Sequence, residues 1–107
     1  MKIIRQGDVL LVAKQLPKAA KLATPDHATD VILAYGEVTG HAHRLRDAYT
    51  TGKAKLWDAG AERYLQVLEI VSLTHEEHST ATIPPGIYLI PTQVDVTTSK
   101  QVRRVAD

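Results

Sequence analysis

Four of the five histidines lie in two short segments of the chain, and these segments are the first candidates for chemistry. The first is Gly-Glu-Val-Thr-Gly-His-Ala-His at residues 36–43, and the second is His-Glu-Glu-His at residues 75–78. Imidazole is the commonest protein ligand for transition metals, and carboxylates often complete such sites. The two segments therefore predict a divalent metal site built from His41, His43, His75 and His78.

The first segment has a simple geometry if it is a strand. Alternate side chains of a strand point to the same face, so His41 and His43 share a face with Leu45. The leucine indicates that this face points inward. Glu37, in the preceding turn, is a candidate general base or hydrogen-bond partner of a ligand, although a turn residue between two glycines is more often structural.

The second segment needs a bend to act as a unit. Residues 75 and 78 fall on opposite faces of a flat strand. If Leu73 and His75 continue one inward face and the chain bends at Glu76 and Glu77, then His78 or a glutamate returns to the same pocket. The glutamates are candidate partners of the ligands or candidate bases; the alternative is a solvated polar turn. The spacing differs from the His-Glu-x-x-His of helical metalloproteases, and no catalytic residue is identified.

Composition limits the class of protein and the kind of metal site. At 107 residues the chain is expected to form a single domain, and with no phenylalanine, one tryptophan and four tyrosines its core must be aliphatic. A net charge of +1 gives no electrostatic reason to expect nucleic acid or an anionic membrane as partner. The absence of cysteine leaves nitrogen and oxygen ligands, which suit zinc, iron or nickel, and fits a cytoplasmic location. Neither a signal peptide nor a membrane span is expected.

Short apolar runs separated by turn residues predict an all-β fold, either a small barrel or a two-sheet sandwich. Within 62–74 the polar spacing would also fit a helix, but β-branched residues favour a strand. Residues 15–29 carry two prolines and are expected to form a flexible loop, and the tail at 100–107 a helical turn or a loose end. Strands are expected at 9–12, 31–35, 41–46, 53–57, 62–74, 80–83, 87–90 and 93–97.

Four motifs together resemble a family of small uncharacterised bacterial and phage proteins. They are Arg-Gln-Gly-Asp-Val-Leu-Leu at 5–11, the two histidine segments, and Pro-Pro-Gly-x-Tyr at 84–88. The resemblance runs from residue 5 to about residue 94, and the histidine motifs are its most specific part. It implies no established activity, but it implies that the histidines form one shared site.

A weaker resemblance is to the cupins, which are double-sheet β-barrels that hold iron, manganese, zinc or nickel. Gly36-x4-His41-x-His43 is similar to the first half of the first cupin motif. The carboxylate that follows here is Asp47 in place of a glutamate, and the later histidines precede the Pro-Pro-Gly turn at 84–86. The resemblance implies a cupin-like barrel but leaves its ligand set open.

The opening segment, residues 4–12, is faintly similar to the first strand of the co-chaperonin barrel. Residues 15–29 would then stand where that family has its mobile loop. This alternative barrel leaves the histidines without a role.

Two functions remain compatible with the sequence. The first is a histidine-ligated divalent metal site on the inner face of the sheets. Three protein side chains on the metal would leave one coordination position open for chemistry on a small-molecule ligand. Four would fill the coordination shell and make the site structural. The second is a non-enzymatic interaction module that presents a sheet edge or residues 15–29 to a protein partner or to another copy of the chain.

Overall fold

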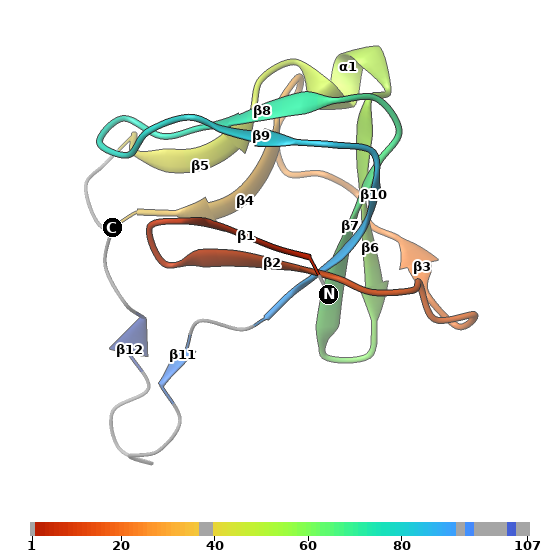
Figure 1. The fold of residues 1–107 in the computed structure, drawn as a ribbon. Coiled ribbons are helices and arrows are strands. Elements are labelled where there is room, and N and C mark those ends of the chain that lie inside the picture. The colour runs from red at the N-terminus through yellow and green to blue at the C-terminus, as the bar shows by residue number, and fades with distance from the viewer. Residues whose placement is uncertain (1, 37–39, 92–93, 96–102, 105–107) are drawn as a thin grey trace.

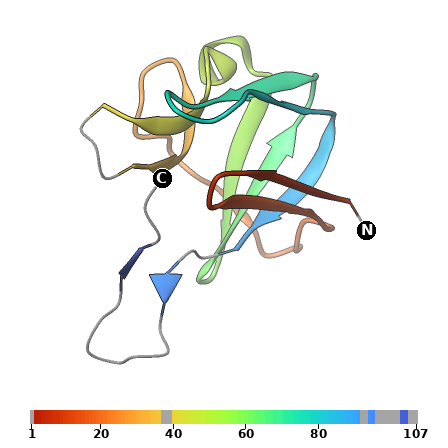
Figure 2. The same cartoon turned by 60° about the vertical axis from the view of Figure 1, so that its left-hand side comes forward.

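The computed structural model describes residues 2–36, 40–91, 94–95 and 103–104, and its main body consists of two antiparallel sheets that face each other (Figures 1 and 2). The larger sheet has six strands in the order β1-β2-β10-β7-β6-β3. Its strands are β1 (Ile3–Gln6), β2 (Val9–Ala13), β3 (Lys21–Leu22), β6 (Ala54–Ala59), β7 (Glu62–Val67) and β10 (Gly86–Ile90).

The smaller sheet has four strands in the order β4-β5-β8-β9. These are β4 (Val31–Tyr35), β5 (Ala42–Leu45), β8 (Val71–Thr74) and β9 (Ala81–Ile83). A two-stranded ribbon of β11 (Val94–Asp95) and β12 (Arg103–Arg104) stands apart. The short helix α1 (Ala48–Thr51) follows β5, and no helix of the described ranges is both long and apolar enough to cross a membrane.

The predicted all-β class and the two-sheet alternative are confirmed. The two sheets do not join into one continuous ladder, so the fold is a sandwich and the closed barrel expected as the other alternative is not formed. Apolar side chains from both sheets fill most of the space between them. The fully buried core residues include Leu11, Leu45, Leu65, Leu73 and Ile83, as an aliphatic composition requires.

The prediction of one strand at 62–74 was wrong. The segment forms two strands, β7 and β8, which belong to different sheets and are separated by residues 68–70. The β-branched residues indicated the conformation correctly, but of the polar positions 66, 69 and 72 only Glu69 lies in the turn where the chain changes sheets.

Smaller differences have similarly local causes. The loop at 15–29 contains β3, which pairs with the end of β6, and its flexibility stays a prediction. The strand expected at 53–57 is longer at its end, since β6 extends to Ala59 and the turn follows at residues 60–61. Pro91 directly follows β10, a central strand of the large sheet, and marks the end of that strand. Arg103–Arg104 are in a strand, where a helical turn or a loose end was expected.

Candidate metal site

The pairing of β5 with β8 brings the two histidine segments together. In this antiparallel ladder Arg44 lies opposite Thr74, and Leu45 lies opposite Leu73. Continuing the same register outward sets His43 across from His75. Because Leu45 and Leu73 are both fully buried, the predicted inward direction of this face is confirmed for His43, which is 1% exposed.

The chain then bends at residues 76–78, as the sequence predicted. The bend returns His78 to the cluster, where its ring centroid lies 4.7 Å from that of His75 and 5.8 Å from that of His43. The His75 ring is central, because it also lies 4.3 Å from the His43 ring and 5.9 Å from the His41 ring. All four predicted histidines therefore meet at one end of the sandwich, where the β8–β9 turn, the start of β5 and the β1–β2 turn come together (Figure 1).

Gln6 positions His43 from the other sheet. The Gln6 amide nitrogen donates to the carbonyl oxygens of Leu73 (2.7 Å) and Ser79 (2.8 Å), so the amide oxygen must face the imidazole. That oxygen lies 2.8 Å from Nδ1 of His43, which therefore carries a proton and donates it. This arrangement fixes the orientation of the ring, as hydrogen-bond partners of metal-site histidines commonly do.

Asp8 completes this side of the cluster. Its Oδ1 lies 3.7 Å from Nε2 of His43. Gly7 makes the approach possible, since its φ of +59° turns the chain sharply between Gln6 and Asp8. The residue before the two-residue loop and the second residue of the loop, Gln6 and Asp8, thus both direct their side chains toward the same imidazole.

His41, His75 and Glu76 form the group best placed to hold a metal ion. One ligand atom from each of the three lies within 4.8 Å of the others. Zinc bonds to nitrogen and oxygen are about 2.0–2.2 Å long, so two ligand atoms on one ion are about 3–3.5 Å apart. Side-chain movements of about 1–2 Å would bring the three groups to that spacing.

Two ring nitrogens of this group are buried without a hydrogen-bond partner. They are Nδ1 of His41 and Nε2 of His75. Oε2 of Glu77 lies 3.1 Å from Nδ1 of His41, which meets the distance of an ion pair, but the two are not aligned for a hydrogen bond. Buried polar atoms nearly always have partners, so both nitrogens need a ligand that the described protein groups do not supply.

The other nitrogen of His75 has a partner that affects metal binding. The backbone N–H of Glu77 donates to Nδ1 of His75 over 3.0 Å. A neutral ring that accepts at Nδ1 carries its proton at Nε2. Binding of a metal at Nε2 therefore requires the proton to move to Nδ1 and the hydrogen bond from Glu77 to open.

Glu76 is held in place by the backbone of the facing strand. The N–H of Ala42 donates to Oε1 of Glu76 over 2.9 Å. This bond is the main cause that lowers the pKa of Glu76; the Glu76 N–H and the charges of His41 and His75 act in the same direction, against desolvation. A carboxylate that stays ionised beside two imidazoles suits a cation.

One candidate from the sequence remains. Glu37 lies outside the described residues. His27 is separate. Its Nδ1 accepts hydrogen bonds from the backbone N–H groups of Thr29 and Asp30 (3.2 and 2.9 Å), so this half-buried side chain organises a turn.

Sequence reasoning missed Gln6 and Asp8 as parts of the site. The available signal was the Arg-Gln-Gly-Asp motif, which was used only for its turn and its resemblance. Gln6 is 3% exposed, and a buried glutamine at a strand end indicates a polar partner nearby.

Comparison with known families agrees with one of the sequence resemblances. A family model described as a domain of unknown function, DUF8820, matches residues 5–93. The chain belongs to this family. The match covers both histidine segments together with Gln6 and Asp8, and it confirms the expectation of a small uncharacterised family. No curated protein and no solved structure gives a significant match, so the cupin and co-chaperonin resemblances and the bacterial or phage source stay predictions.

Proposed function

We propose that this DUF8820 chain binds one divalent transition-metal ion through His41, His75 and Glu76. The observation that carries the proposal is the pair of buried, unpartnered nitrogens, which belong to the two histidines of the ligand group. An unsatisfied buried polar atom costs about 1–3 kcal/mol. A cation would use both nitrogens and remove that cost.

The donor set favours zinc or iron(II) among the metals considered. Two imidazoles and one carboxylate are found in catalytic zinc sites and in non-heme iron(II) sites, both of which keep open coordination positions. Three protein ligands therefore favour metal-assisted chemistry on a small molecule over a closed structural site. His43 and His78 support the ligands through ring contacts, and the four-histidine ligand set stays the alternative.

The rearrangement at His75 does not prevent binding. Opening the Glu77 hydrogen bond costs about 1 kcal/mol. Binding of zinc at structural sites in small proteins contributes roughly 10–16 kcal/mol at neutral pH. The free energy of metal binding exceeds that of the hydrogen bond by an order of magnitude, so we expect the turn at 75–77 to rearrange around the ion.

Elemental analysis of untagged protein, purified without chelator and then titrated with zinc and iron(II), tests the proposal. About one ion per chain is expected for the wild type. His41→Ala and His75→Ala should each weaken binding at least 100-fold, because each removes a ligand. His27→Ala is the matched control, since it makes the same change in a histidine that only holds a turn, and it should keep the wild-type stoichiometry.

The outcomes separate the two functions derived from the sequence. Unchanged metal content in a His41→Ala, His75→Ala double variant would exclude this ligand group. A wild type that takes up no metal, together with an intact fold after both substitutions, would favour the interaction module. Loss of metal only when His43 and His78 are also replaced would favour the four-histidine set.

A further inference from the structure

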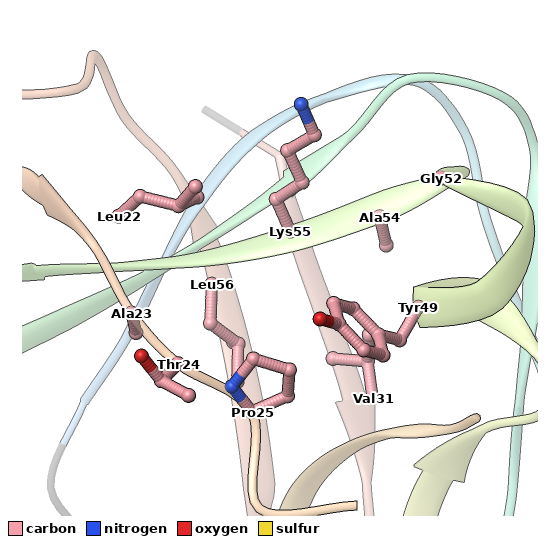
Figure 3. A pocket seen from close by; sticks show the side chains of 10 residues that line it. All are labelled: Leu22, Ala23, Thr24, Pro25, Val31, Tyr49, Gly52, Ala54, Lys55 and Leu56. Carbon is pink, nitrogen blue, oxygen red and sulfur yellow. The ribbon is translucent and has the colours of Figure 1, made fainter. Parts of the chain in front are cut away.

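A second concave site lies away from the histidines, between β3, α1 and β6. It is a cavity of about 220 Å³ whose walls come from residues 22–25, Val31, Tyr49 and the start of β6. Figure 3 shows the side chains of Leu22, Pro25, Leu56 and Tyr49 around it. Leu22 is 58% exposed and Tyr49 is 49% exposed, so these two side chains form the open rim above a buried floor.

The wall formed by α1 is fixed before any ligand arrives. The carbonyl oxygen of Thr29 accepts hydrogen bonds from the N–H groups of Tyr49 (3.0 Å) and Thr50 (3.2 Å). The carboxylate of Asp30 accepts one from the N–H of Asp47 (2.8 Å), just before the helix. These bonds fix the backbone from which the Tyr49 side chain extends, so this part of the wall need not be ordered when a ligand binds.

The opposite wall is fixed by β6. Leu22 pairs with Trp57 in the sheet, and the N–H of Ala23 donates to the carbonyl oxygen of Leu56 over 2.8 Å. Pro25 then restricts the backbone where the segment leaves the sheet. The segment at 22–25 is therefore held in place by backbone hydrogen bonds and forms one wall of the cavity.

The side chains that line the cavity are apolar apart from those of Thr24, Tyr49 and Lys55. The Tyr49 hydroxyl points across the cavity toward Leu56 and Pro25 (Figure 3) and has no hydrogen-bond partner among the described residues. The Lys55 ammonium extends away from the cavity (Figure 3). An ionised ligand would therefore lie in apolar surroundings without a counter-charge, which is unfavourable.

We propose that this cavity binds an uncharged single-ring molecule that carries one hydroxyl or carbonyl group, held by the Tyr49 hydroxyl. The size follows from volume, because an apolar protein cavity of about 150 Å³ accommodates benzene, and about 220 Å³ leaves room for a substituent. This inference is independent of the metal site, since the two sites share no residue.

Titration of the labelled protein with phenol, benzene and benzoate, followed by amide chemical shifts, tests the proposal. Phenol should shift amides at residues 22–25, 49 and 54–56 in a saturable way, and benzene should bind at the same place. Tyr49→Phe should weaken phenol about two- to tenfold, the value of one hydrogen bond, and leave benzene unchanged. Tyr35→Phe is the matched control on another half-exposed tyrosine, and it should change neither affinity.

Three results would overturn the proposal. They are the absence of saturable shifts with phenol and benzene, shifts centred elsewhere, or benzoate binding as tightly as phenol. Ala23→Leu adds bulk to the wall and should abolish both phenol and benzene binding. An Ala23→Leu protein that is folded, by its amide spectrum, and still binds phenol normally would also count against this cavity.

Discussion

The histidine site and the Asp30 centre, which consists of Asp30 with Thr29, Arg44 and Asp47, are both polar clusters at the ends of β4 and β5. They differ in how many of their polar atoms have hydrogen-bond partners. Asp30 accepts hydrogen bonds from the Asp47 N–H (2.8 Å), the Thr29 hydroxyl (3.0 Å) and Arg44 (3.0 Å). The histidine site instead leaves one nitrogen each of His41 and His75 without a partner. Polar groups that stabilise a fold usually have all their hydrogen-bond partners within the protein. Groups that bind a ligand keep donors or acceptors without a protein partner.

The difference therefore assigns different roles to the residues of the two clusters. Asp30 precedes β4 and holds the residue before α1, and its carboxylate oxygens already accept three hydrogen bonds. Among the described residues of this cluster, Nε of Arg44 is the buried side-chain atom without a partner. His43 is also satisfied, through Gln6, and its role is to position. His41 and His75 are the members that keep free capacity, which is why they carry the proposed function.

The largest expected effect is on stability at the Asp30 centre. Asp30→Ala removes three hydrogen bonds and leaves Arg44 without its ion pair, so we expect a loss of about 3 kcal/mol in the free energy of unfolding. Metal stoichiometry should not change. Urea denaturation measures the first quantity and elemental analysis the second. Asp26→Ala, at an exposed aspartate, is the control and should cost about 0.5 kcal/mol or less.

The same variant gives a pH test. The Asp47 N–H is the largest cause that lowers the pKa of Asp30 below 3.8, helped by Thr29 and Arg44 and opposed by burial. A carboxyl whose pKa is lowered by folding stabilises the protein above its unfolded pKa, and this contribution is lost as the pH falls through the folded pKa. The stability difference between wild type and Asp30→Ala should stay constant from pH 7 to pH 5 and shrink below pH 3.8. A stability difference that stays constant down to pH 2 would contradict the conclusion that the ionised Asp30 carboxylate stabilises the fold through its hydrogen bonds.

An intermediate effect is expected at Gln6. Gln6→Leu leaves His43 Nδ1 and two backbone carbonyls without their partner, which should lower stability by about 2 kcal/mol. It should also weaken metal binding about 10- to 100-fold, because the imidazole packed against His75 loses its orientation. Thermal melts of apo protein and zinc titrations separate the two effects. An unchanged zinc affinity would show that His43 does not position the ligands.

The smallest expected effect is at the Glu77 amide. In the apo protein this N–H donates to Nδ1 of His75, and metal binding at Nε2 requires the bond to open. Hydrogen exchange at Glu77 should therefore become faster on addition of zinc, while most neighbouring amides become slower. Slower exchange at Glu77 would indicate that Nδ1 of His75 keeps its hydrogen bond and that the ion binds elsewhere.

The sequence predicted the face of the histidines better than it predicted their neighbours. Alternation with Leu45 and Leu73 gave the inward direction, and Glu76-Glu77 indicated the bend, because both are local properties. The positions of Gln6 and Asp8 depend on how the β1–β2 hairpin packs against the other sheet, which no local pattern encodes. The division of 62–74 between two sheets was not predicted for the same reason, since the point at which a chain passes from one sheet to the other depends on tertiary packing. The cavity gave no signal in the sequence, because its walls come from separate elements, β3 with the residues after it, β4, α1 and β6, whose packing no local pattern encodes.

The hydrogen bonds of Gln6 also have a consequence for the order in which the protein acquires its site. They connect residue 6 with residues 37, 67 and 73 positions further along the chain. Contacts of such long sequence separation form late in folding, because the loops between them must close first. A ribosome must therefore release the chain past Ser79 before the imidazole cluster can assemble, and early metal capture by a partly synthesised chain is disfavoured. Uptake of an ion by the proposed site would therefore report that Gln6 has already met residues 43, 73 and 79.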